Sequence, residues 1–485
     1  MLLSELIDQN GRASAIDVAG LACDSRDVQP GYLFAAFPGA KTDGAQYVAD
    51  AIARGAVAVL AAPDVHIPDG EVYRLAAANP RRRFASLVAR FYGPQPDTIA
   101  AITGTNGKTS VASFTRQIWQ HLGYPSASIG TLGVMAPGYE RPLKLTTPDT
   151  VTLHEALRDL KLRGIEHVAC EASSHGLVQH RLDGLVLRAA AFTNLSRDHM
   201  DYHSSVEDYF FAKARLFGEV MKPGGVAVLN VDDPHGAELE SLCWARGHKV
   251  IGVGEGDGDL RLLSRAPTES GQVLTLSYKG RVMDLTLPLV GAFQAMNALI
   301  SAGLAAACGA DEMAALNAIQ HLRAVPGRLQ LVGRHPTGAR VYVDYAHTPD
   351  ALKNVLTALR PHTAGRLKVV FGCGGDRDAG KRPLMGEVAA ELADEVFVTD
   401  DNPRSENPAA IRDAVMAGCP DAHNIGDRRA AIRAAVADLQ AGDTLVVAGK
   451  GHETGQIIGT EVIDFNDAVE VRNALAGLQS GSKVR

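Results

Sequence analysis

The sequence indicates an α/β protein of three domains, on the basis of three observations. The chain has 485 residues, which at roughly 150 residues per domain suffices for about three separate cores. Short β-rich apolar runs alternate with helical patterns through the middle and the last third of the chain, as expected of mostly parallel sheets covered on both faces by helices. Two proline-containing breaks divide these regions.

The breaks set the expected domain boundaries. The first is YGPQPDT at 92–98, a short polar run with two prolines ahead of an apolar strand pattern, which suits a linker. The second is HLRAVPGRLQLV at 321–332, where an Ala-rich helical pattern ends at Pro326-Gly327. We therefore predict a small N-terminal α/β domain over 1–96, a central domain over 97–328 and a C-terminal domain over 329–485.

The central domain is predicted to contain a mostly parallel sheet of the phosphate-loop type. Its strand patterns each end in polar sequence: TIAAIT before the Gly-rich loop, HVACEA before SSHG, AAAFTN before LSRDHMDYH, and GVAVLN before VDDPH. A helix is predicted over KTSVASFTRQIWQHLG, with Val111, Phe114, Ile118 and Leu122 on one face and Gly123 as its stop. All four polar segments should lie at the rim where ligands of such sheets bind.

The C-terminal domain repeats the arrangement and is predicted to be a Rossmann-like α/β domain. RVYVDY precedes AHTPDAL, LKVVFG precedes CGGDRDAGKRP, EVFVTD precedes DNPRSENP, and TLVVAG precedes KGHETG. Its polar segments should also gather beyond the strand ends. Two such rims facing each other would form a cleft between domains.

Composition excludes several classes of protein. Lys and Arg number 48 against 55 Asp and Glu, for a formal charge of −7, and no dense basic run offers a nucleic-acid surface. The six cysteines form no CxxC pair, so a zinc ribbon or disulfide framework is not expected. The N-terminus lacks a leader pattern and no long uncharged apolar stretch occurs. We expect a cytoplasmic protein without membrane insertion.

The segment ITGTNGKTS at 102–110 resembles a phosphate loop with unusual spacing. The common pattern places a Gly five residues before the Gly-Lys pair, and Ile102 occupies that position. A Gly-rich turn between strand and helix still points backbone N–H groups at an anion, with Lys108 to neutralise phosphate and the Thr109 hydroxyl to bind Mg²⁺. A tight turn with a solvated lysine is the alternative.

Carboxylate and imidazole groups follow the neighbouring strands. Glu171, Ser173 and His175 end one strand pattern, and His199 follows another, between Asp198 and His203. These groups suit Mg²⁺ beside a phosphate. For His199 alone an ordinary loop histidine is the better interpretation, but the collected set favours a metal-dependent site.

The motifs resemble one family along nearly the whole chain. GTNGKTS, EASSHGL, TNLSRDHMDYH, the AK of YFFAKARLF, GAFQAMNAL, VPGR, VDYAHTPDAL, FGCGGDRDAGKRP, DNPR and AGKGHE occur in the order found in the bacterial Mur ligases. The family's phosphate loop is the shorter GTNGKT form, which explains the spacing. The resemblance implies a monomeric, cytoplasmic, ATP- and Mg²⁺-dependent ligase of peptidoglycan precursor synthesis. Its substrates would be UDP-N-acetylmuramoyl-L-alanyl-D-glutamate and meso-2,6-diaminopimelate.

The resemblance also implies roles for individual residues. The residues implied to be catalytic are Lys108, Glu171, His199 and Lys213. The residues implied to hold Mg²⁺ are Thr109, Glu171, His199 and Lys213. The resemblance implies that Lys213 is carbamylated to N6-carboxylysine, whereas by sequence alone it is interpreted as a solvated or snorkelled helix lysine. Gln294 departs from the family, which often has Asn there. ATP would contact Gly104, Thr105, Asn106, Gly107, Lys108, Thr109, Ser110, Asn297, Arg328 and Asp344.

Two further residue sets are implied for the other substrates. For the residues of the N-terminal domain, the alternative interpretation is that they are structural polar residues of hairpin loops. For Arg404, the alternative interpretation is a surface ion pair. A guanidinium at Arg404 can grip a distal carboxylate with two parallel hydrogen bonds, while Glu453 and the Gly449 backbone receive the ammonium. The muramoyl dipeptide nucleotide would contact Cys23, Ser25, Thr42, Asp43, Gly44, Thr146, Thr147, Ser173, Gln179 and Arg181. Diaminopimelate would contact Arg377, Asp401, Asn402, Pro403, Arg404, Gly449 and Glu453.

Three rival functions stay open at this point. Folylpolyglutamate synthase shares the loop and the acyl-phosphate chemistry, but lacks a domain of about 95 residues ahead of the loop and the DNPR segment. A P-loop kinase or NTPase would turn over ATP without an amine acceptor. A nucleotide-regulated binding protein would have no catalysis.

Overall fold

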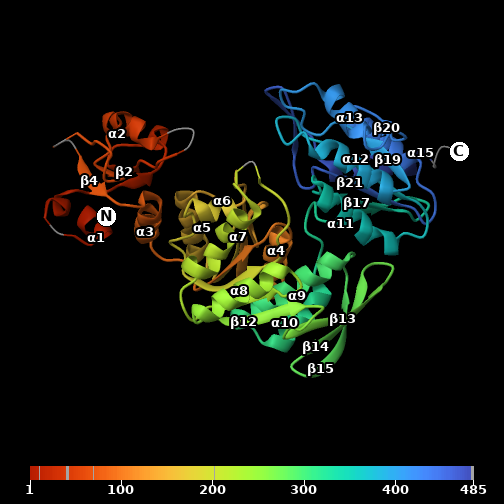
Figure 1. Ribbon diagram of the computed structural model, residues 1–485, viewed down its shortest axis with the longest axis horizontal. Coiled ribbons are helices and arrows are strands. Elements are labelled where there is room, and N and C mark those ends of the chain that lie inside the picture. Colours follow the sequence, from red (N-terminus) through yellow and green to blue (C-terminus); the bar gives the residue numbers. More distant parts are fainter. Residues whose placement is uncertain (10, 40–42, 69, 71, 201, 482–485) are drawn as a thin grey trace. The chain divides into compact units, whose positions relative to one another are not determined.

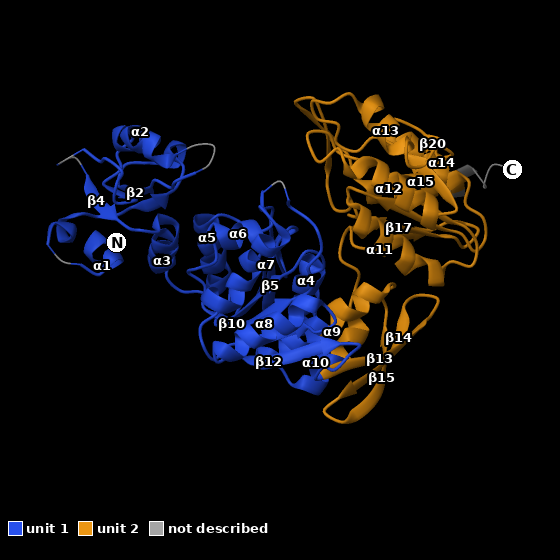
Figure 2. Ribbon diagram, viewed as in Figure 1, with its two compact units in different colours: residues 1–259, 300–316 blue, residues 260–299, 317–485 orange. Residues whose placement is uncertain are grey.

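The computed structural model describes residues 1–485 except 10, 40–42, 69, 71, 201 and 482–485. The chain forms two compact units, residues 1–259 with 300–316 and residues 260–299 with 317–485 (Figure 2). Their boundaries fall after residue 259, within α9 (Ala292–Ala307) and within α10 (Glu312–Ala318). Across the described residues, no helix has both the length and the apolar character needed to cross a bilayer.

Unit 1 begins with a four-stranded parallel sheet in the order β1-β2-β3-β4 (Figure 1). The helix after it starts cleanly because the Asn79 side chain accepts a hydrogen bond from Arg82 N and Pro80 occupies the first turn. The elements are α1 (Leu3–Ile7), η1 (Arg12–Ala15), β1 (Gly20–Ala22), η2 (Ser25–Asp27), β2 (Tyr32–Ala35), η3 (Gly44–Tyr47), α2 (Val48–Ala53), β3 (Ala58–Ala61), β4 (Tyr73–Ala76) and α3 (Pro80–Tyr92).

The central sheet of unit 1 confirms the predicted parallel arrangement. Strands β12-β11-β10-β5-β9-β6 run parallel, and β7 and β8 add an antiparallel edge that the sequence patterns did not indicate. The elements are β5 (Thr98–Thr103), α4 (Lys108–His121), β6 (Ser126–Gly130), β7 (Gly133–Ala136), β8 (Tyr139–Arg141), α5 (Thr150–Leu162), β9 (His167–Glu171), α6 (Ser174–Val178), β10 (Leu187–Phe192), α7 (Val206–Arg215), η4 (Leu216–Val220), β11 (Val226–Asn230), α8 (Pro234–Ala245) and β12 (Lys249–Gly254).

Helices cover both faces of this sheet because successive strand residues point to opposite sides. One face packs Ile99, Ala101 and Cys170 in a core with residues of α5, α7 and α8. The predicted helix after the Gly-rich loop, α4, contacts β5, β6 and β9 and buries Val111, Phe114 and Ile118. The sheet is therefore buried on both faces, which accounts for its near-continuous apolar strands.

The order of the strands brings the predicted polar segments together. Strand β5 lies between β10 and β9, and β6 flanks β9. Ile102 pairs with Glu171, and Ile129 pairs with Cys170. The carboxyl ends of β5, β9, β10 and β11 consequently meet at one rim, as the sequence predicted. The end of β6 lies beside that of β9 and adds to the same rim.

Unit 2 contains an antiparallel meander and a six-stranded sheet in the order β16-β17-β21-β18-β19-β20. Only β16 is antiparallel among the described pairings of the second sheet. Separate apolar cores cover its two faces, as predicted for an open α/β sheet. The strands are β13 (Leu260–Pro267), β14 (Gln272–Tyr278), β15 (Arg281–Leu287), β16 (Gln330–Arg334), β17 (Arg340–Asp344), β18 (Leu367–Phe371), β19 (Glu395–Val398), β20 (His423–Asn424), β21 (Thr444–Ala448), β22 (Gly455–Ile458) and β23 (Glu461–Asp464).

The helices of unit 2 connect these strands. Several begin with a side-chain cap, such as Thr348 before α11 and Asp427 before α14. They are η5 (Ile319–His321), α11 (Pro349–Leu359), η6 (Arg360–His362), α12 (Lys381–Leu392), α13 (Pro408–Met416), α14 (Arg428–Ala437) and α15 (Asp467–Gly481).

Candidate active site

The Gly-rich loop joins β5 to α4 in a turn that requires its glycines. Gly104 has φ +147°, and a Cβ there would lie 1.9 Å from Thr193 Oγ1. Gly107 has φ +89° immediately before the first residue of α4. Backbone N–H groups at the start of a helix attract anions. The loop therefore has the local structure of a phosphate-binding turn despite its short spacing.

Residues after β10 hold the loop. Asn194 Oδ1 accepts from Asn106 N at 3.0 Å, and Thr193 Oγ1 donates to Asn106 O at 2.5 Å. Thr105 Oγ1 accepts from Ser196 N at 2.9 Å. The role of this TNLS segment in supporting the loop was not predicted, because only the order of the strands places it there.

Two lysines converge on one carbonyl oxygen of the loop. Lys108 Nζ donates to Gly104 O and to Thr105 O, both at 2.8 Å. Lys213 Nζ, from α7, also donates to Gly104 O at 2.8 Å and lies 4.1 Å from the centre of the Tyr209 ring. Lys213 is 1% exposed. Burial, and then the charge of Lys108, hold the pKa of Lys213 well below its usual value.

A buried group of oxygen atoms surrounds Glu171 at the end of β9. Its Oε2 accepts from Thr109 Oγ1 at 3.0 Å and from Thr131 Oγ1 at 3.1 Å, and its Oε1 accepts from Thr131 N at 2.8 Å. A Cβ at Gly130 would lie 2.1 Å from Glu171 Oε1, so glycine is needed there. Thr131 was not predicted, although its place directly after β6 was a usable signal.

The predicted histidines lie near one another. The His175 ring centre is 5.0 Å from that of His199 and 5.9 Å from that of His203. His199 has a left-handed backbone, φ 56°, and its ring lies 6.1 Å from that of Tyr209, the residue under Lys213. Among the described residues, no group of three or more His, Cys, Asp or Glu side chains has the arrangement of a metal site.

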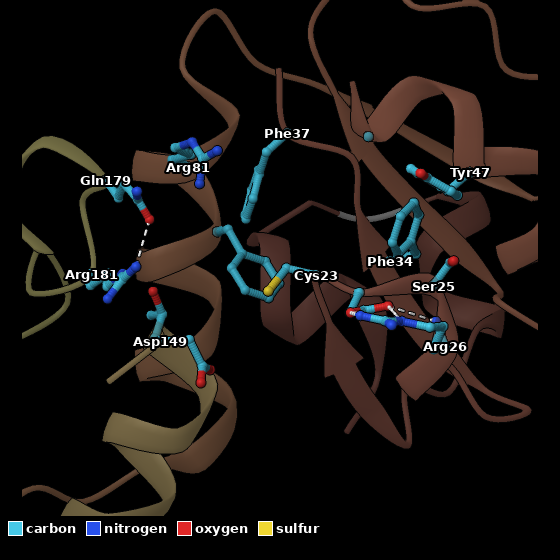
Figure 3. A pocket seen from close by; sticks show the side chains of 14 residues that line it. Cys23, Ser25, Arg26, Phe34, Phe37, Tyr47, Arg81, Asp149, Gln179 and Arg181 are labelled. Atoms are coloured by element: carbon cyan, nitrogen blue, oxygen red, sulfur yellow. Dashed lines mark hydrogen bonds and ion pairs between the residues drawn. The ribbon is translucent and has the colours of Figure 1, made fainter. Parts of the chain in front are cut away.

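A separate cavity of about 590 Å³ lies in unit 1 (Figure 3). Figure 3 shows Arg81, Gln179 and Arg181 on one side of it, with Phe34 and Ser25 opposite. Of the predicted residues Cys23, Ser25, Gly44, Gln179 and Arg181 line it, whereas Asp43 caps η3 and Thr42 lies outside the described residues. The lining is Cys23, Asp24, Ser25, Arg26, Phe34, Phe37, Gly44, Tyr47, Arg81, Phe84, Asp149, Thr150, Gln179 and Arg181.

The cavity combines cations with aromatic rings. The Arg81 guanidinium lies 4.6 Å from the centre of the Phe37 ring, and Arg181 donates to Gln179 Oε1 at 2.7 Å. Burial raises the pKa of the Cys23 thiol to about 11, with a smaller contribution from Asp149, so a thiolate is not expected. Guanidinium groups beside rings suit an anionic ligand that carries a flat base. Arg81 was missed because NPRRRF does not show which arginine faces the cavity.

The remaining predicted residues of unit 1 connect this cavity to Glu171. Arg181 donates to Thr147 O at 2.6 Å, and Thr147 Oγ1 donates to Glu171 O at 2.8 Å. Thr146 Oγ1 lies 3.1 Å from Thr131 Oγ1. Ser173 caps α6 through its Oγ, and its N–H donates to Thr147 Oγ1 at 2.9 Å. A continuous polar path thus runs from the cavity to the Gly-rich loop.

In unit 2, the DNPR and AGKGHE segments meet beside β21. Asn402 Nδ2 donates to Glu453 Oε2 at 3.0 Å, and Lys450 Nζ donates to Asn402 Oδ1 at 2.9 Å. Gly449 has φ +114°, and a Cβ there would lie 2.8 Å from Asp401 Oδ2. Pro403 is buried, whereas Arg377 is exposed and donates to Asp376 O at 3.3 Å. Lys450 was not predicted, although it lies inside the AGKGHE motif.

Arg404 has a left-handed backbone, φ 51°. Its N–H donates to Ile457 O at 3.1 Å and its carbonyl accepts from Gly459 N at 2.8 Å, so the β22–β23 hairpin fixes it. Its NH1 donates to Gly375 O at 2.7 Å. Within the described residues its hydrogen bonds use NH1 alone among the guanidinium nitrogens, which leaves the Nε–NH2 edge for a carboxylate.

The residues of unit 2 that were implied to contact ATP, together with Gln294, lie near the first strands of the C-terminal sheet. Buried Asp344 accepts from Leu329 N at 2.6 Å and from Ala346 N at 2.7 Å, and burial raises its pKa. Arg328 lies 4.4 Å from the centre of the Tyr345 ring. Gln294 Nε2 donates to Arg328 O at 3.3 Å, and its Oε1 accepts from Asn297 Nδ2 at 3.3 Å.

Comparison with known proteins gives matches along the chain. Residues 17–89 match the family described as "Mur ligase family, catalytic domain", 102–305 match "Mur ligase middle domain", and 327–451 match "Mur ligase, glutamate ligase domain". The relative from Mesorhizobium japonicum is 53% identical over 475 residues, 98% of each chain, and is named UDP-N-acetylmuramoyl-L-alanyl-D-glutamate–2,6-diaminopimelate ligase. The relative of the same name from Agrobacterium fabrum is 52% identical over 100% of this chain and 97% of its own. A solved structure of that ligase, 33% identical, covers 99% of both chains with a TM-score of 0.74.

Proposed function

The chain belongs to the Mur ligase family, and from this premise we propose that it joins meso-2,6-diaminopimelate to UDP-N-acetylmuramoyl-L-alanyl-D-glutamate with ATP. The observation that carries the choice of substrates is the 53% identity, over 98% of both chains, to a relative with that name. The reaction is an ATP-dependent amide ligation in peptidoglycan precursor synthesis.

The Gly-rich loop receives the phosphates of ATP. The N–H groups of Thr105 and Asn106 are taken up by Asn194, so we propose that the N–H groups at the start of α4 face the phosphates. Lys108, held at the loop by Gly104 O and Thr105 O, would neutralise their charge. In unit 2, Asn297, Arg328 and Asp344 are proposed to contact the adenine and ribose. Gln294 departs from the family, but it is compatible with this proposed role of Asn297 and Arg328. Its side chain is hydrogen-bonded both to Asn297 and to Arg328 O.

The residues present fit Mg²⁺. Thr109 Oγ1 and Glu171 Oε2 are hard oxygen donors 3.0 Å apart, and Mg²⁺ is usually held by one or two protein oxygens together with phosphates and water. When bound, Mg²⁺ offsets charge on the transferring phosphoryl group. We propose that Thr109 and Glu171 hold one ion, and that His199 and carbamylated Lys213 support a second.

The environment of Lys213 supports its carbamylation. An amine must be neutral to add CO₂, and burial beside Lys108 lowers the pKa of Lys213 and favours that form. The carbamate is an anion and would be attracted by the ammonium of Lys108, which donates to the same Gly104 O as Lys213. The side chain would then become an oxygen ligand.

Acyl transfer follows in two steps. The D-glutamate side-chain carboxylate attacks the γ-phosphorus, giving an acyl phosphate and ADP. The neutral amine of the amino acid attacks the acyl carbon, and the tetrahedral intermediate collapses with loss of phosphate. Lys108 stabilises the charge on the phosphoryl oxygens during transfer.

The other substrates occupy the remaining sites. The cavity in Figure 3 is proposed for the uridine diphosphate end, because Arg81 and Phe37 offer a cation and a ring. Thr146, Thr147, Ser173, Gln179 and Arg181 lead toward Glu171 and are proposed for the muramoyl dipeptide. The cluster of Arg377, Asp401, Asn402, Pro403, Arg404, Gly449 and Glu453 is proposed for diaminopimelate.

The domain boundaries, the oligomeric state and the cellular location are also proposed. We propose domains over 1–96, 97–328 and 329–485 for the nucleotide-linked dipeptide, ATP and the amino acid. A monomer located in the cytoplasm is also proposed. Size-exclusion chromatography with light scattering measures the oligomeric state directly.

The experiment is an ADP-release assay with each substrate omitted in turn. Release that requires both the UDP-linked dipeptide and meso-diaminopimelate supports the proposal. Release without an amine acceptor would instead indicate a kinase or NTPase. Release with a folate substrate and glutamate would indicate a folylpolyglutamate synthase.

A further inference from the structure

Lys450 is a fully buried lysine inside the proposed amino-acid site. It follows β21 and has a side-chain exposure of 0%. Its Nζ donates to Asn402 Oδ1 at 2.9 Å and to Glu453 Oε2 at 3.0 Å. A buried ammonium is costly unless its partners are well placed. Both partners here are residues proposed for diaminopimelate, whereas Lys450 itself has no role in that proposal.

The lysine fixes the orientation of Asn402. An ammonium only donates hydrogen bonds, so the amide oxygen of Asn402 must face it. Ile457 N donates to the same oxygen at 3.0 Å. The amide nitrogen is thereby directed to Glu453 Oε2, at 3.0 Å. Asn402 is 4% exposed, so rotation toward water offers it no alternative partner.

Both contacts to the Glu453 carboxylate fall on one oxygen. Lys450 and Asn402 donate to Oε2, and within the described part of the chain no hydrogen bond reaches Oε1. The Glu453 side chain is 33% exposed. One oxygen is thus anchored in the protein while the other remains available to a ligand.

We propose that Lys450 is a positioning residue of the amino-acid site: it anchors Glu453 through Oε2 so that Oε1 receives the distal ammonium of the incoming amino acid. The inference rests on the proposed function and adds to it a residue that acts on specificity without touching the substrate. Loss of Lys450 removes one of the two donors to Glu453 Oε2 and one of the two donors to Asn402 Oδ1, so the Glu453 carboxylate is held less firmly. The distal ammonium would then lose its charge-assisted hydrogen bond, while the distal carboxylate would keep its partner at Arg404.

The test compares two acceptors in Lys450→Met and in wild type. meso-Diaminopimelate carries the distal ammonium, and 2-aminopimelate has the same distal carboxylate without it. We expect Lys450→Met to raise the KM for diaminopimelate about tenfold or more, and to change the KM for 2-aminopimelate and for ATP less than about threefold. The preference for diaminopimelate, as the ratio of kcat/KM values, should fall accordingly.

A second buried lysine of the same sheet provides the matched control. Lys368 in β18 is also 0% exposed and pairs with Glu395 and Asp438, which are not among the proposed site residues. Lys368→Met should lower the melting temperature but leave the acceptor ratio unchanged. The double variant Lys450→Met with Glu453→Gln should show no further loss of preference than Glu453→Gln alone, because Lys450 acts through Glu453.

Two outcomes would overturn the inference. One is an equal loss with both acceptors in Lys450→Met, which indicates a purely structural lysine; the other is an unchanged ratio. Should Lys450→Met fail to fold, Lys450→Arg keeps a charge with different reach and must shift the same ratio. Wild-type protein that does not ligate diaminopimelate would instead refute the proposed function, so the two failures are distinguishable.

Discussion

The side chain of Lys213 donates to Gly104 O over 2.8 Å, although 109 residues separate the two along the chain. The same oxygen accepts from Lys108. A buried lysine is thereby held against the phosphate loop and a second cation. This contact joins the helix α7 to the loop that is proposed to bind ATP.

Lys213→Ala is expected to be nearly inactive, because it removes the proposed carbamate ligand. Added short-chain carboxylates such as acetate should restore part of the activity by occupying the vacated space. The measurement is the rate of ADP release with both substrates, and sodium chloride at equal ionic strength is the control. Wild-type-like activity, or no rescue by any small carboxylate, would count against the carbamate.

Lys108→Ala should fold normally but lose ligation by about a thousandfold or more, because phosphoryl transfer depends on charge neutralisation. A half-buried lysine at the first position of a helix contributes little to stability. Thermal unfolding and steady-state rates separate the two effects. The exposed Lys222→Ala is the matched control and should behave like wild type. Retained turnover in Lys108→Ala would refute the role of the loop.

Gly130→Ala tests the proposed metal site, because Gly130 packs against the Glu171 side chain. The new Cβ would lie 2.1 Å from Glu171 Oε1, so Glu171 must move away from Thr109. We expect a raised Mg²⁺ requirement and at least about a tenfold lower rate at limiting Mg²⁺. Gly256→Ala is the control, because its Cβ would meet only Asp232 Oδ1, at 3.5 Å. An unchanged Mg²⁺ titration would remove Glu171 from the proposed site.

Arg404→Ala should lose most of the preference for meso-diaminopimelate over L-lysine. A charge-assisted hydrogen bond contributes about 1.5–3 kcal/mol, so wild-type discrimination should reach roughly a hundredfold. The check is a competition assay at equal concentrations of both amino acids. The exposed Arg433→Ala should retain the wild-type ratio. Equal incorporation by wild type would overturn the specificity and leave the ligase reaction intact.

His154 should contribute to loss of stability in mild acid. Burial lowers its pKa from 6.5 to about 4. Between these values the unfolded chain binds a proton that the folded chain does not, so stability falls as pH decreases from 6.5 to 4. The loss amounts to about 3 kcal/mol. Denaturant unfolding should show a correspondingly shallower pH dependence in His154→Leu than in wild type, and parallel curves for the two proteins would contradict this.

Features that depend on local pattern could be predicted from the amino-acid sequence. The alternation of strand and helix patterns predicted the parallel sheets of both units, and the strand, Gly-rich turn and helix at 98–121 were recognisable because each depends on neighbouring residues. The order of the motifs identified the family. The roles assigned to individual residues remain predictions, since motif identity alone does not give their geometry.

Which side chains meet one another depends on the packing of elements that are distant in the sequence. The Gly130–Glu171 contact arises because β6 lies beside β9, and no local pattern encodes that neighbourhood. Arg81 lines a cavity while adjacent arginines do not, because helix α3 presents only one of them there. Burial of Lys213 and Lys450 likewise depends on elements distant in sequence. A lysine is ordinarily solvated, so its sequence gives no sign of burial until the fold supplies both the apolar surroundings and the partner.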